Sequence, residues 1–506
     1  MPVDSTHPQY DSYFARWSRC RDCVVGEDAV KAAGEKYLPK LGGQDSDDYS
    51  GYKMRAMFYG AAHRTVEALS GMVFRKQPTV KLPKGKEDLK KAMGSHGESL
   101  DLLATQMLTE VLTVGRRGAM VDMDPAGKGK PFVSVYDAED IINWEEASID
   151  GKKQPVMVVL REQKRVKKPE DRFKWEFQEY FRVLRLVDGV YTQEIHEKTP
   201  NVVSRTQQES QPASKATGQT VAEGLSGFSI TETITPLRAG GKNFNYIPFV
   251  FIGPDGLDSC CQKPPLLDLV NVNLSHYRTS ADLEHGRHFT ALPVAWAAGF
   301  ETTGTTLRIG SAVAWTSQDP SARAGYLEFT GAGLGHLKDG LADKEKNMAT
   351  LGARLLQEEK RDAETAETMR MKQGGEQSVL SKVARSVSEA MTQLLKWLFD
   401  WQAITPAEGD VMVELNQKYS VLLMAPEMLT SLLGNYQSGG MSFEVYFHNL
   451  QQSEIYPDDH TIEKERELIA SGGPMSPAGQ TELEAARLAL EEPEEDPEEE
   501  PTATAA

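Results

Sequence analysis

Hydrophobic residues recur at helical spacing through the first part of the chain. Between Tyr49 and Met72 they follow one another at steps of three and four, at Tyr52, Ala56, Tyr59, His63, Val66 and Leu69. This spacing places them on one face of an α-helix and predicts a helix that ends near Gly71 and Pro78. The same reasoning predicts a second helix over 99–114, which closes at Gly115, and the run GAMVD at 118–122 predicts a short buried strand.

Between residues 131 and 195 the pattern changes to short runs of β-branched and aromatic residues. These runs predict strands at Phe132–Tyr136, Val156–Leu160, Phe177–Leu186 and Val190–Ile195. Asp188-Gly189 separates the last two, which is a strong signal for a tight hairpin. Residues 200–226 contain few large apolar side chains and predict a mobile surface loop, and a further strand is expected at Ile247–Ile252.

The second half of the chain returns to helical spacing, with one interruption. A helix is predicted over 265–289 and another over 333–356, and the apolar runs between them predict a small β insertion at 291–330. Lys344 is the one polar member of the second helix's stripe. A polar stretch, Gln357–Glu364, precedes a predicted helix over 365–401, which Gly374-Gly375 should bend or start afresh. The stripes of the three helices, in chain order, are Leu267, Val270, Leu274, Tyr277 and Ala281; Leu334, Leu337, Leu341, Lys344, Met348, Leu351 and Leu355; and Leu380, Val383, Val387, Met391, Leu394, Leu398 and Trp401.

Smaller helices are predicted over 425–470, and the last residues form a disordered acidic tail. The chain has 506 residues and a net charge of −18, of which Glu491–Glu500 supplies eight negative charges and leaves ten on the rest. An acidic body argues against tight general binding to phosphate backbones, although DNA could still slide past it. No apolar run is long enough to cross a membrane, and the polar N-terminal stretch predicts a protein made and used in the cytoplasm of its producing cell.

Candidate chemistry in the sequence is weak, so we expect neither catalysis nor a cofactor. The nearest approach to a phosphate-binding loop, Gly127-Lys128-Gly129-Lys130, lacks the required spacing and the Ser or Thr that holds magnesium. One group of acids could suggest a magnesium nuclease, but turn and strand-end acids are the favoured interpretation. That group is Asp122, Asp124, Asp137, Glu139 and Asp140.

The histidines and cysteines also favour structural interpretations. His285 and His288 could share one helical face as metal ligands, but no third ligand lies near in the sequence, which favours a surface or stacking role. Cys20 and Cys23 form one C-x-x-C pair, and Cys260 and Cys261 are neighbours. Zinc binding or redox activity is possible for such pairs, but we expect inert cytosolic thiols and no metal site.

The order of these elements resembles the portal proteins of tailed bacteriophages, and the local sequence resembles a branch of that superfamily with an uncharacterised domain. The resemblance covers about 1–200 and 245–470. It is carried by Arg21–Leu41, Tyr52–Pro78, Glu110–Asp124, Tyr136–Trp144, Leu266–Ala281, Glu328–Gly335 and Met348–Leu356.

The resemblance implies an α+β portal fold, rich in helix, with named regions. It implies a wing at 1–265, which joins the long helix 365–402, and a stem of helices 265–290 and 333–356. Between the stem helices it implies a clip at 291–332. After them it implies a channel loop at 357–364 and a crown at 403–490, while the acidic tail at 491–506, expected to be disordered from its composition, falls outside the resemblance.

The resemblance further implies a dodecameric ring at one vertex of the capsid of the virion, assembled in the host cytoplasm. Double-stranded DNA would pass through the ring during packaging and ejection. The partners would be other copies of the chain, the major capsid and scaffolding proteins, the terminase and head-tail adaptor proteins, with no membrane. The candidate DNA-channel residues are Lys338, Lys344, Gln357, Lys360 and Arg361. The alternative is another head-tail connector or a minor capsid protein.

Overall fold

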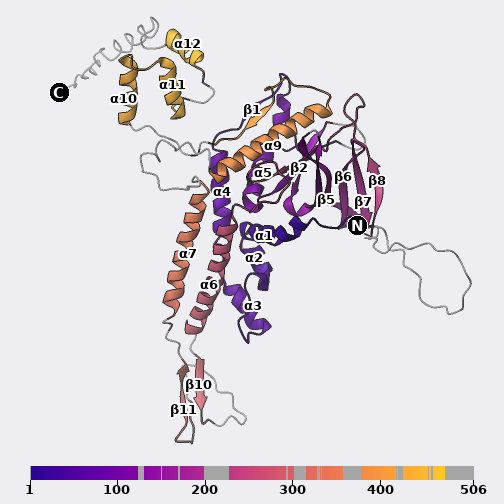
Figure 1. Ribbon diagram of the computed structural model, residues 1–506. Helices are drawn as coiled ribbons and strands as arrows, with labels where there is room; N and C mark the ends of the chain where they lie inside the picture. Colours follow the sequence, from indigo (N-terminus) through magenta and orange to yellow (C-terminus); the bar gives the residue numbers. More distant parts are fainter. Residues whose placement is uncertain are drawn as a thin grey trace, which may run out of the picture. The chain divides into compact units, whose positions relative to one another are not determined.

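A computed structural model describes most of the chain outside a set of gaps. It covers residues 2–123, 130–149, 151–168, 171–198, 227–291, 294–300, 315–327, 331, 333–356, 378–417, 419, 426–453, 455–456 and 460–472. The chain divides into two compact units, Met1–Tyr419 and Ser420–Ala506. Helices and strands both contribute substantially, which confirms a mixed α and β architecture (Figure 1). The predicted loop at 200–226 and the acidic tail lie outside the described residues.

The N-terminal part is helical. Its helices are α1 (Pro8–Val25), α2 (Glu27–Ala32), α3 (Ser46–Arg55), α4 (Ala61–Val73) and α5 (Leu100–Val114), with short 3-10 turns at Gly34–Lys36 and Glu87–Lys90. Ser99 caps α5 by accepting from the backbone N–H of Leu102, and Gly115 ends the helix at a φ of 74°. The predicted helix over 99–114 is therefore confirmed.

The single helix expected from Tyr49 to Met72 is wrong, because the chain breaks between α3 and α4. Ala56 adopts an extended conformation at φ −59° and ψ 135°. Asn273 of α6 (Leu267–Ala291), which is fully buried, supports the break by donating to the Tyr59 carbonyl at 2.7 Å and accepting from the Ala62 N–H at 3.4 Å. A long-range side chain therefore satisfies backbone groups that a continuous helix would have paired internally. His63, expected on the apolar stripe, is exposed.

Among the described residues, strands form four sheets. A three-stranded sheet has the order β3-β2-β9, from Phe132–Asp137, Arg117–Asp122 and Phe249–Ile252. A five-stranded antiparallel sheet follows the chain from β4 to β8, through Ile141–Ile149, Lys152–Lys168, Asp171–Val187, Val190–Lys198 and Phe228–Ile234. The strands predicted to begin at Phe132, Val156, Phe177 and Val190 are confirmed with extended bounds, and the strand predicted at Ile247–Ile252 is confirmed as the shorter β9. The sequence pattern missed β4 and β8.

The turn at Asp188-Gly189 is confirmed as a two-residue hairpin. Asp188 has a φ of 50° and Gly189 a φ of 76°, and Val187 pairs with Val190 directly across the turn. Positive φ at both central positions suits the right-handed twist of the flanking strands, which explains the Asp-Gly choice. The hairpin fixes the register between β6 and β7.

Two long helices lie side by side and are joined by a β-hairpin (Figure 1). The first is α6, and the second is α7 (Leu334–Arg354). Between them β10 (Val294–Ala298) pairs antiparallel with β11 (Arg323–Leu327), so the predicted β insertion is confirmed for the described part. All five residues of the predicted α6 stripe are buried, whereas only Met348 and Leu355 are buried on the α7 stripe.

The long helix α9 spans Val379–Trp401, and Ser378 caps it by accepting from the backbone N–H of Ser381. Its predicted seam is confirmed, because all seven residues from Leu380 to Trp401 are buried against α5 and the β2 and β9 strands. The expected beginning at Thr365 and the Gly374-Gly375 bend lie outside the described residues.

Residues after α9 belong to both units. Strand β12 (Met412–Glu414) pairs antiparallel with β1 (Thr79–Lys81) in the first unit, so 403–419 are part of that unit rather than the beginning of a separate crown. In the second unit, α10 (Pro426–Gln437), α11 (Phe443–Gln452) and α12 (Ile462–Gly472) confirm the helices expected over 425–470. There, the rings of Phe447, Tyr456 and His460 stack on one another.

Candidate functional site

Lys344 and Lys338 of α7 occupy different environments. The Lys344 ammonium donates to the Ser275 carbonyl oxygen at 3.3 Å and to the Thr279 hydroxyl, both on α6. Burial lowers the pKa of Lys344. Lys338 is exposed and lies six residues earlier, about 120° away around the helix. Lys344 therefore joins α6 to α7 within one chain, whereas Lys338 is exposed on a different side of α7.

The other candidate channel residues, Gln357, Lys360 and Arg361, lie outside the described residues. The described residues on the two sides of this gap lie close together, because the backbone N–H of Leu380 donates to the carbonyl oxygen of Leu355 at 3.2 Å. The end of α7 and the beginning of α9 are therefore adjacent.

A second polar contact between α6 and α7 involves His276. Its Nε2 lies 3.3 Å from a carboxylate oxygen of Glu345, and its ring packs near that of Tyr59. Burial lowers the pKa of His276, with a smaller contribution from the nearby positive charge of Lys344, while the contact with Glu345 opposes this shift. The two helices are thus joined by polar groups at neighbouring positions 344 and 345, a contact that the stripe pattern could not reveal.

A groove lies between α4 and α7, with a cavity volume of about 280 Å³. Small residues line it, among them Ala68, Ala349 and Gly352, and Thr65 approaches Gly352 so closely that a Cβ there would meet its hydroxyl oxygen at 3.4 Å. Arg64 and Glu345 also line the groove. No local sequence pattern predicts this groove, because the lining residues come from two helices that are far apart in the chain.

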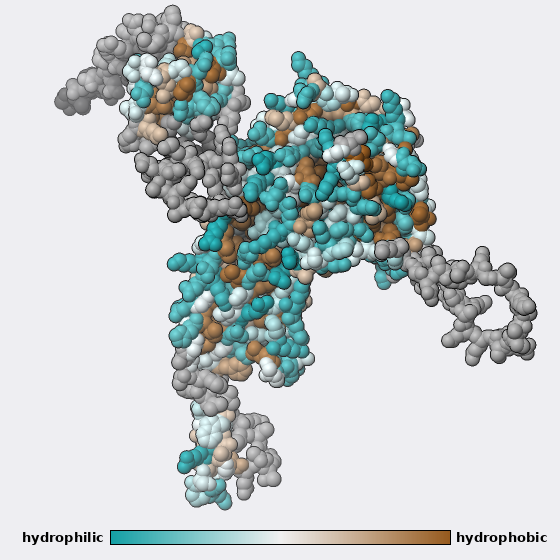
Figure 2. Space-filling view, in the orientation of Figure 1, coloured by the Kyte–Doolittle hydropathy of each residue, from teal (hydrophilic) through white to brown (hydrophobic). Residues whose placement is uncertain are grey.

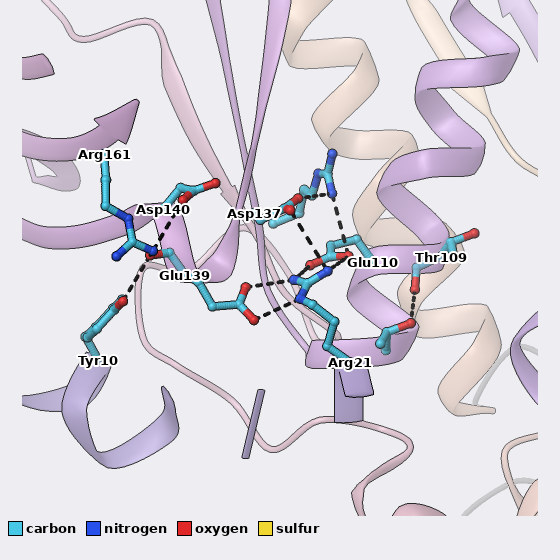
Figure 3. Close-up of polar contacts among 10 residues, drawn as sticks. Tyr10, Arg21, Thr109, Glu110, Asp137, Glu139, Asp140 and Arg161 are labelled. Atoms are coloured by element: carbon cyan, nitrogen blue, oxygen red, sulfur yellow. Dashed lines mark hydrogen bonds and ion pairs between the residues drawn. The ribbon is translucent and has the colours of Figure 1, made fainter. Parts of the chain in front are cut away.

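The acidic residues singled out in the sequence, where the structure describes them, are paired with arginines. Arg21 of α1 binds both Glu110 of α5 and Glu139, while Asp137 pairs with Arg117 (Figure 3). Asp140 lies near Arg161, and Asp122 pairs with Arg182 at 3.1 Å in the five-stranded sheet region. Asp124 lies outside the described residues. This arrangement agrees with the interpretation of the acids as structural groups at turns and strand ends.

Arg21 and Glu110 are the polar residues that sequence reasoning missed. Arg21 donates to both oxygens of Glu139, at 2.9 and 2.7 Å, and also to Glu110. Glu110 is only 7% exposed, and burial raises its pKa although Arg21 opposes the shift. A charged residue within the otherwise apolar α5 was the available signal, because a buried carboxylate requires a cation beside it.

The histidine and cysteine candidates have structural surroundings. His285 makes edge contacts with the rings of Tyr52 and Phe289, which confirms the stacking interpretation, and its Nδ1 lies 3.2 Å from Arg55. Cys20 and Cys23 are buried, and burial raises the pKa of Cys20 to about 12. Such thiols stay protonated and unreactive.

Within the described residues, no three or more His, Cys, Asp or Glu side chains are grouped so as to hold a metal ion. Their helices also include none that is long and apolar enough to cross a membrane. Residues 127–129 of the Gly-Lys-Gly-Lys segment lie outside this part of the chain.

Comparison with known families gives a match over the helices just described. Residues 265–402 match the family described as Domain of unknown function (DUF4055). The matched range runs from the beginning of α6 through the β10–β11 hairpin and α7 to the end of α9. The description of that family states no function.

Comparison with whole proteins gives only weak similarity. No curated protein matches the chain. A solved chain titled "Virion of native gene transfer agent (GTA) particle" overlaps 83% of this chain and 96% of its own length, at 11% identity and a TM-score of 0.33. Overlap at that score does not define a shared fold.

Proposed function

We propose that this protein is the portal protein of a tailed bacteriophage, a subunit of the ring through which DNA enters and leaves the capsid. The order of elements between 265 and 402 carries the proposal. Two long helices, α6 and α7, are joined by a β-hairpin and followed by the amphipathic α9, in the order that the portal resemblance implies. The same range matches the family described as a domain of unknown function.

The packing of α7 also supports a role in an assembly. Only two of its seven stripe residues are buried, and Leu334, Leu337, Leu341 and Leu351 remain partly exposed. Figure 2 shows hydrophobic residues at the surface over this pair of helices. A helix that leaves part of its apolar face open needs a further partner. In a closed ring, neighbouring copies supply that partner through one repeated head-to-tail contact.

The proposed ring is a dodecamer in the virion, at one capsid vertex. Its partners are the major capsid and scaffolding proteins, the terminase, head-tail adaptor proteins and the double-stranded DNA in the channel. We propose no catalytic role, since the acidic residues considered for one are paired with arginines where they are described. Lys338 is the best-placed described candidate for the channel wall, while Lys344 acts within the subunit.

Negative-stain electron microscopy combined with native mass measurement tests the proposal. We expect closed rings with a central hole and a single mass near twelve subunits. A chain that remains monomeric at all concentrations, or that forms only a two-fold dimer, would contradict the portal assignment. Smaller closed assemblies without a passage would favour the alternative of a minor capsid or connector protein.

A further inference from the structure

The distal half of the β5–β6 hairpin is a two-stranded ribbon with an exposed aromatic face. β4 pairs with β5 only as far as Leu160, and β7 pairs with β6 only from Tyr180 onward. Phe173 lies at a register irregularity near the start of β6, and Trp175 and Phe177 stand at alternate positions beyond it and share one face. They are 76%, 53% and 61% exposed. Figure 2 shows hydrophobic surface in the region of these strands.

Two cations lie on the same ribbon face. Lys167 is paired across the strands with Trp175 and Arg165 with Phe177, and the cations lie 5.0 Å and 5.5 Å from the respective ring centres. Both are exposed, and no carboxylate of the described residues lies within ion-pair distance of either one. Aromatic rings held rigid by cations are typical of the energetic centres of protein interfaces.

A protein partner suits this face better than a lipid or nucleic-acid partner. Asp171 is exposed at the start of β6, where an inserted hairpin tip would meet lipid headgroups. The chain carries a net charge of −18, which opposes approach to phosphate backbones. An acidic protein surface with apolar side chains would complement the ribbon in both charge and hydrophobicity.

The chain carries such a surface on α3. Asp47 and Met54 lie seven residues apart on one side of that helix, with Asp48 beside them and Met57 just beyond its end. Met54 is 72% and Met57 62% exposed, and among the described residues neither aspartate is paired with a cation. Asp47 to Met54 spans about 10 Å along the helix. Methionine sulfur also packs well against aromatic rings.

We propose that the aromatic–basic face of the β5–β6 ribbon binds the acidic methionine face of α3 on the next copy of this chain. The proposal rests on the proposed ring, in which every copy must present two different complementary surfaces. Arg165 and Lys167 face Asp47 and Asp48 across the contact, and Trp175 and Phe177 cover Met54 and Met57.

Charge reversal on each side tests the contact in the full-length chain. Arg165→Glu with Lys167→Glu, and separately Asp47→Lys with Asp48→Lys, should each raise the concentration at half assembly about tenfold, because like charges then meet. The fourfold variant that combines them should return close to the parent value. Circular dichroism and thermal unfolding confirm that each variant is folded. Single reversals that weaken assembly without rescue in the combined variant would overturn the pairing with α3.

A disulfide between copies provides a second measurement. In a background with Cys260→Ser and Cys261→Ser, Trp175→Cys combined with Met54→Cys should cross-link neighbouring subunits upon oxidation, whereas either cysteine alone should not. Normal rings from every charge variant, with no cross-link, would overturn this contact and leave the ring itself intact. A parent chain that never assembles would overturn both the contact and the proposed function.

Discussion

Arg21 of α1 and Glu110 of α5 form a partly buried ion pair between residues that are 89 positions apart in the chain. Arg21 also donates two hydrogen bonds to Glu139, so one guanidinium connects α1 and α5 to the turn before β4 (Figure 3). Because Glu110 is almost fully buried, its carboxylate depends on this cation. The pair therefore fixes how the N-terminal helices meet the sheets.

Removal of the cation should destabilise the first unit. Arg21→Ala leaves Glu110 and Glu139 without their main partner, and we expect a loss of about 3 kcal/mol in the free energy of unfolding. Arg287→Ala is the matched control, because its pair with Glu284 is exposed and three residues away on one helix, where about 0.5 kcal/mol or less is at stake. Urea unfolding measures both. Equal effects of the two substitutions would refute a special role for Arg21.

His276 should make the α6–α7 contact sensitive to acid. Burial holds the pKa of His276 below its ordinary value of 6.5, so the unfolded chain binds a proton more readily than the folded one. The stability contributed by neutral His276 is therefore present above pH 6.5 and is lost as the pH falls below it.

The measurement compares thermal unfolding at pH 7 and pH 5 in the parent chain and in His276→Gln. The parent should lose more stability on acidification than the variant. His7 and His285 also have pKa values lowered by burial, so both chains keep a common acid dependence, and only the difference between them reports on His276. An identical loss in both chains would show that His276 does not titrate in this range.

Periodicity predicted the helices well where one face meets the core of the same unit. The seam of α9 and the stripe of α6 are buried throughout, because each helix is covered by other elements of the chain. The predicted helix is wrong at residues 56–60, where apolar residues keep their helical spacing but the helical backbone is interrupted between α3 and α4. There the deciding group is Asn273, more than two hundred residues away, and no local pattern contains it.

Polar contacts were harder to predict than helices. Lys344 interrupts an apolar stripe, and the sequence could not tell whether it faces a channel, another subunit or the same chain. In the structure the Lys344 ammonium binds to α6, where the Ser275 carbonyl and the Thr279 hydroxyl accept its hydrogen bonds. β4 was missed because Glu145 and Glu146 interrupt its apolar run, and β8 because polar residues alternate along it.

The two lysines of α7 should respond differently to substitution. Lys344→Ala removes hydrogen bonds to α6 and should lower the free energy of unfolding by about 1 kcal/mol. Lys338→Ala removes an exposed side chain and should change it by less than about 0.5 kcal/mol. Under the proposed function, Lys338→Ala should nevertheless alter DNA packaging. Denaturant unfolding separates the two effects, and a larger loss of stability for Lys338→Ala would contradict these assignments.

The last prediction concerns how DNA passes the ring. Double-stranded DNA carries about one charge per 1.7 Å, so a strongly basic channel would hold the genome in place. Between Lys338 and Glu364 the sequence has six basic and seven acidic residues, which is close to neutral. Sparse contacts from Lys360 and Arg361 would touch DNA without arresting it.

Lys360→Ala with Arg361→Ala should therefore leave rings intact but change the amount of nuclease-protected genome in assembled particles. Lys90→Ala with Lys91→Ala removes the same charge from exposed positions outside the 265–402 region and should package like the parent. If the first double variant also packages and retains DNA like the parent, residues 357–364 do not form the channel contact.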